Sequence, residues 1–113
     1  MVDDMKIGMK ISVRSVQVDS DVGKMRVSFS PPIEFEVTEE NGALWVDDYR
    51  TDIVEFASTI DGLRKMVRKS LAEVYEDYAL APDEILARDA LELKKFLLER
   101  SGKLEKEGEI SGE

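Results

Sequence analysis

Apolar residues change their spacing once along this 113-residue chain, at Ser58. Before Ser58 they alternate with polar residues, as in strands with one buried face, and after it they recur every three or four positions, as along one face of a helix. Strands followed by helices are typical of an α+β domain. We therefore expect a two-layer α+β domain, in which an antiparallel sheet of four to five strands packs on a long helix and a helical extension follows.

The alternating half of the chain predicts a series of hairpins. Strands are expected at 5–18 and 24–29, joined by a turn at 19–23. The apolar residues change phase near Arg14, which indicates a β-bulge. The sequence Ser30-Pro31-Pro32 is expected to end the second strand, because proline lacks the amide donor that a strand ladder requires.

Three further strands are expected at 33–37, 43–46 and 53–57. The first two flank Asn41-Gly42, a pair that favours the positive φ angles of a tight hairpin turn. The segment 47–52 is expected to be a loop before the last, short strand. Together with the first two, these segments give the upper limit of five strands.

The second half of the chain predicts two helical segments, at 59–79 and 83–100, the second of them interrupted near Asp89. Either Ser58 or Thr59 can cap the first helix. We expect one domain over residues 1–102 and a mobile acidic tail over 103–113, because the tail has little apolar surface to bury.

The composition excludes several kinds of chemistry. The chain contains no Cys and no His, so it lacks a thiolate nucleophile and the commonest general base and transition-metal ligand. It has no apolar run near the ~18 residues that a membrane span requires, and its N-terminus has no apolar targeting segment. We expect a cytoplasmic, non-enzymatic protein with no catalytic, cofactor-binding or metal site.

Negative charge is concentrated in residues 31–55. That segment has eight acids and one base, which gives −7 of the formal net charge of −9. An acidic surface disfavours direct contact with nucleic acid and suits a basic protein partner. Aromatic residues frequently anchor such contacts, although Trp45 has core packing as an alternative. The expected partner-binding residues are Glu34, Glu36, Trp45 and Tyr49.

The predicted long helix has its charges in the unfavourable order. Its basic residues come first and its acids last, whereas the helix dipole favours the reverse order. A homodimer in which the basic residues of one chain face the acids of the other would offset this arrangement; the alternative is a solvated face that pairs partly with the acidic segment of its own chain. The expected dimer-interface residues are Arg64, Lys65, Arg68 and Lys69, with Glu73, Glu76 and Asp77.

Residues 33–80 resemble HicB-like antitoxins. The segment IEFEVTEENGALWVDDYRTDIVEFASTIDGLRKMVRKSLAEVYEDYAL has the order of that family: a strand, an acidic hairpin turn, a second strand, a short strand and a helix that opens at Thr59. The resemblance implies a partial RNase H-like fold without catalysis. It also implies a small basic toxin of the HicA type as the partner, which the antitoxin binds and masks.

Two other functions remain open at this point. The chain can be a stand-alone homodimeric acidic protein, or a metal-dependent nuclease that uses the carboxylates of Asp47, Asp48 and Asp52. The function expected first is a protein-interaction module, similar to HicB-like antitoxins, that binds a basic partner.

Overall fold

The computed structural model describes residues 5–21 and 23–101. Within them lie a four-stranded antiparallel sheet, a long helix and a C-terminal helix, so the expected α+β architecture is confirmed. The predicted tail at 103–113 lies outside the described residues. In chain order the elements are β1 (Met5–Ser20), β2 (Gly23–Glu40), β3 (Ala43–Asp48), β4 (Ile53–Ala57), α1 (Ile60–Val74), a π-helical turn η1 (Tyr75–Ala79), a 3₁₀ turn η2 (Asp83–Ile85) and α2 (Arg88–Ser101).

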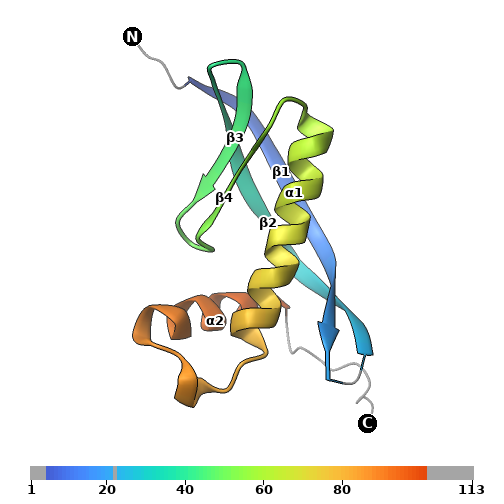
Figure 1. Cartoon of the computed structure of the whole chain (residues 1–113), viewed down its shortest axis with the longest axis vertical. Coiled ribbons are helices and arrows are strands. Elements are labelled where there is room, and N and C mark those ends of the chain that lie inside the picture. The colour runs from blue at the N-terminus through green and yellow to red at the C-terminus, as the bar shows by residue number, and fades with distance from the viewer. Residues whose placement is uncertain (1–4, 22, 102–113) are drawn as a thin grey trace.

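The sheet is a meander in the order β1-β2-β3-β4. Strands β1 and β2 form a long, twisted hairpin that extends well beyond the shorter β3–β4 hairpin (Figure 1). The molecule is elongated, with axes of 54 × 28 × 21 Å. At the β2–β3 turn, Asn41 and Gly42 have φ angles of 55° and 78°, which confirms the predicted tight turn.

The two prolines do not end the second strand, so this prediction was wrong. Strand β2 runs through Pro31 and Pro32, because they fall where the β1–β2 ladder is already interrupted. Val13 pairs with Ile33 and Ser15 with Ser28, which leaves residues 29–32 of β2 opposite Arg14 alone. A missing amide donor therefore costs no ladder bond there. The bulge predicted near Arg14 is confirmed, and the sheet has four strands, within the expected range of four to five.

Helix α1 and its π-helical continuation span Ile60–Ala79, in agreement with the predicted helix at 59–79. Thr59, and not Ser58, is the N-cap: its Oγ1 accepts a hydrogen bond of 3.0 Å from the amide of Gly62. The second predicted helix is divided into η2 and α2, and α2 begins at Arg88.

One face of the sheet holds the core. Helix α1 lies across this face along the β1–β2 hairpin, and α2 packs at the lower end (Figure 1). Leu97 is the buried residue of α2, and Tyr75 from η1 meets Phe29 of β2 edge to face. The α1 residues that face the sheet with no exposed surface are Leu63, Val67 and Leu71. None of the helices in residues 5–21 and 23–101 is long and apolar enough to cross a lipid bilayer.

Candidate protein-binding site

An aromatic pair lies on the outer face of the sheet, which α1 does not cover. Alternation along β3 buries Val46 and turns Trp45 outward, while alternation along β4 buries Ile53 and exposes Val54 and Phe56. Trp45 and Phe56 are cross-strand partners whose stacked rings have centroids 4.7 Å apart. Trp45 therefore does not pack in the core, and it forms the half-buried part of an exposed apolar patch that we call the Trp45 patch (Trp45, Val54 and Phe56).

Trp45 also carries an unusual polar atom. Its indole Nε1 is buried and has no hydrogen-bond partner among the described residues. Leaving a buried donor unpaired costs about 1–3 kcal/mol, so most such groups in native proteins have a partner. Because this atom has almost no exposed surface, Trp45 contributes to the patch through its apolar ring and not through this donor.

Acidic side chains from β2 lie on the same outer face. Glu34 and Glu36 are exposed, in alternation with the buried Ile33, Phe35 and Val37. Glu34 is partly neutralised, since its carboxylate lies 3.7 Å from Lys10 Nζ and accepts a hydrogen bond from Ser12 Oγ at 3.4 Å. The structure thus places three of the four predicted partner-binding residues, Glu34, Glu36 and Trp45, on one face.

The fourth predicted residue, Tyr49, lies apart from them in the β3–β4 turn, with 90% of its surface exposed. Asp48 builds this turn: its Oδ2 accepts from the Thr51 amide at 3.0 Å and from Thr51 Oγ1 at 2.7 Å, and its Oδ1 accepts from Arg50 Nε at 2.9 Å. The carboxylate that a metal site would use is therefore engaged in the turn. Within the described residues, no group of three or more acids is arranged to hold a metal ion.

Arg50 has a structural importance that the sequence analysis missed. Its Nη2 donates to the carbonyl oxygen of Glu34 at 2.6 Å, and its guanidinium lies 5.9 Å and 5.3 Å from the ring centroids of Phe35 and Phe96. Arg50 thereby joins the β3–β4 turn to β2 and to α2. It does so at a point where β3 no longer pairs with β2. The signal available in the sequence was its position as the one base among the eight acids of residues 31–55.

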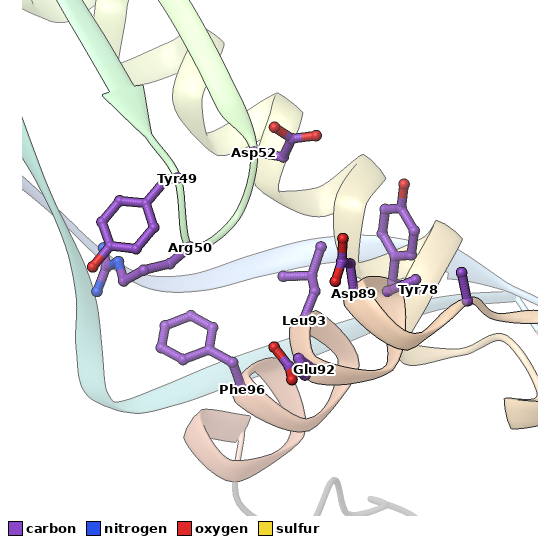
Figure 2. A pocket seen from close by; sticks show the side chains of 10 residues that line it. Tyr49, Arg50, Asp52, Tyr78, Asp89, Glu92, Leu93 and Phe96 are labelled. Carbon is purple, nitrogen blue, oxygen red and sulfur yellow. The ribbon is translucent and has the colours of Figure 1, made fainter.

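Beside this turn lies a groove of about 630 Å³. Figure 2 shows Leu93 of α2 in its middle, with Asp89 and Tyr78 on one side and Phe96 and Arg50 on the other. A smaller groove of about 250 Å³ runs between β4 and α1 and shares Asp52 and Tyr78 with the larger one. The two grooves therefore adjoin at these two residues.

The predicted dimer-interface residues lie on different flanks of α1 and of its continuation η1. Arg64 pairs with Asp61 of its own helix at 2.9 Å, and Arg68 Nη2 donates to the carbonyl of Ser15 on β1 at 3.3 Å. Glu76 accepts from the amide of Asp19 on β1 at 2.7 Å. Glu73 and Asp77, in contrast, line the smaller groove beside β4. Lys65 and Lys69 are exposed.

Comparisons with models of protein families, with curated proteins and with solved structures gave no match.

Proposed function

We propose that this chain is a protein-interaction module, similar in role to HicB-like antitoxins, and that it binds a basic protein partner on the outer face of its sheet. The observation that carries the proposal is the Trp45 patch, an exposed apolar surface next to acidic residues in a chain of which 36% is charged.

The anatomy of this face fits a protein interface. Val54 and Phe56 are each 55% exposed, and the stacked Trp45 holds Phe56 in place. Aromatic residues at the centre of a patch with charged residues at its rim are typical of binding hot spots. The rim here contains Glu34, Glu36 and Asp47, so a basic partner is favoured over an acidic one.

The proposal is tested by affinity capture from the source cells with the unmodified chain and with Phe56→Ser. We expect the unmodified chain to retain a basic protein that Phe56→Ser loses, with the purified partner then titrated by calorimetry. Ile85→Ser is the matched control, because Ile85 is a 70% exposed apolar residue of η2 outside the patch. Capture of the same proteins by the unmodified chain and Phe56→Ser would contradict the proposal.

Charge at the rim is tested separately. The double change Glu34→Lys with Glu36→Lys should slow association with the captured partner, mainly through the encounter rate, and the loss should shrink as salt is raised. Glu84→Lys with Glu99→Lys changes the net charge equally at exposed positions of η2 and α2. Equal losses in both double variants, measured by stopped-flow binding, would show a general charge effect and no role for this rim.

A further inference from the structure

Strand β4 is an edge strand with an unpaired side. It is last in the sheet order, and within the part of the chain that the structure describes its five residues pair with β3 alone. No backbone hydrogen bond joins its other side to the rest of the described chain. In an antiparallel pair, alternate residues direct their N–H and C=O groups away from the partner strand, so β4 presents free donors and acceptors. Such an edge is a template for another strand.

This edge has only part of the usual protection against strand pairing: it is short, with five residues, and it has one inward-facing charge, Glu55. Native edges commonly carry lysine, proline or a bulge, and Ile53–Ala57 contains neither lysine nor proline and pairs with β3 without a register shift. Its one charged residue, Glu55, accepts a hydrogen bond from Ser70 of α1 and so is held against the helix.

The space beside the edge is acidic. The smaller groove runs along β4 and is lined on the helix side by Ser70, Glu73 and Asp77, whose spacing of three and four places them on one flank of the helix. Asp52 joins it to the larger groove, where Asp89 and Glu92 continue the negative charge. Among the described residues, Arg50 is the one base that lines either groove, and it is paired with Asp48 at 2.9 Å.

We infer that the proposed partner docks by adding an extended, basic segment to the free edge of β4, an inference that rests on the proposed function. Side chains of an added strand alternate between the two faces of the sheet. Those on the inner face would point toward Glu73 and Asp77, and those on the outer face would extend the Trp45 patch. The segment that fits therefore alternates lysine or arginine with apolar residues.

A second copy of the chain fits this edge poorly. Twofold pairing of β4 with β4 would bring two acidic grooves together, and like charges at close range repel. Pairing of β4 with β1 of another copy would leave a free edge at each end and build an open chain instead of a closed oligomer. Repulsion between the acidic grooves and the lack of a closed oligomer thus both favour a different, basic partner.

The inference is tested with the full chain and a synthetic peptide in which lysine or arginine alternates with valine. We expect the peptide to slow amide hydrogen exchange, followed by NMR, at alternate residues of β4 by about tenfold or more. A peptide with glutamate in place of the basic residues should not bind. Glu73→Lys with Asp77→Lys should weaken binding of the basic peptide by about tenfold at low salt, while Glu84→Lys with Glu99→Lys leaves most of the affinity.

Three results would overturn the inference. The first is binding of the basic peptide without slowed exchange in β4, and the second is no binding at millimolar peptide. The third is slow exchange of all β4 amides in the free chain that disappears on dilution, because a second copy would then occupy the edge. The capture experiment with Phe56→Ser does not depend on the peptide, so failure of the edge mechanism is distinguishable from failure of the proposed function.

Discussion

At the residue scale, Asp47 and Asp48 are sequence neighbours with opposite surroundings. Asp47 is exposed on β3, whereas Asp48 has 12% of its side chain exposed and accepts hydrogen bonds from Thr51 and Arg50. The sequence alone treats the two as equivalent acids. Their difference arises from the geometry of the β3–β4 turn, in which Thr51 has no exposed surface.

Replacing Asp48 by Ala should therefore destabilise the fold. The change leaves the Thr51 amide and hydroxyl and part of Arg50 without their acceptor, a loss of about 1–3 kcal/mol in the free energy of unfolding. Asp47→Ala, the matched control, should stay within about 0.5 kcal/mol. Urea unfolding followed by circular dichroism compares the two, and equal stabilities would refute the role given to Asp48.

The residues of the Trp45 patch differ in how far the sequence predicts them. Once Val46 is taken as buried, alternation along β3 places Trp45 on the other face, so its outward position was predictable. The outward position of Phe56 was not predictable in the same way. It requires that the neighbouring charged residue Glu55 faces inward, and this depends on a hydrogen bond to Glu55 from Ser70 of α1. Contacts between distant elements decide such positions.

At the element scale, the strands and helices follow from periodicity, and their interruptions follow from it only in part. The phase change near Arg14 correctly indicated the bulge. The prolines were wrongly taken as a strand end, because the sequence alone does not show that they lie where the β1–β2 ladder is interrupted. Their position depends on the register between β1 and β2. The grooves beside β4 were likewise not predictable, because they require the placement of α1 and α2 against the β3–β4 turn.

The start of α1 gives a sharp test at this scale. Thr59→Ala removes the acceptor of the Gly62 amide and should cost about 0.5–2 kcal/mol of stability. Ser58→Ala, one residue earlier, should cost less than about 0.5 kcal/mol. Thermal or urea unfolding in which the Ser58 variant loses more than the Thr59 variant would contradict the observed cap.

The docking of α2 gives a second test. Leu97 has no exposed surface, whereas Ile85 in the preceding turn is 70% exposed. Leu97→Ala should cost about 2–5 kcal/mol, because it removes buried contacts and leaves a cavity, and Ile85→Ala should cost less than about 0.5 kcal/mol. A Leu97→Ala variant as stable in urea as the unmodified chain would show that α2 contributes little to the fold.

At the scale of the whole molecule, the charged residues of the long helix and its continuation lie toward different edges of the sheet. The base Arg68 meets β1, and the acids Glu73 and Asp77 line the groove beside β4. The acid Glu76 of η1 also meets β1, through the amide of Asp19, so the acids predicted to share a dimer interface lie on separate flanks of α1 and η1.

The homodimer stays a prediction. If α1 lies at its interface, changing Arg64, Arg68 and Lys69 to Glu should loosen the dimer most at low salt, because exposed ion pairs are screened and contribute only about 0–1 kcal/mol each. Sedimentation at several salt concentrations measures this. An unmodified chain that is monomeric at tens of micromolar would refute the dimer.

The central claim is that a basic partner binds the β2–β3–β4 side of the molecule. Hydrogen exchange over the whole chain, with and without the captured partner, tests it most directly. We predict that protection on binding is confined to β3, to β4 and to the outer-face residues around Glu34 and Glu36. Protection centred instead on residues 64–69 of α1, with exchange in β4 unchanged, would contradict the account.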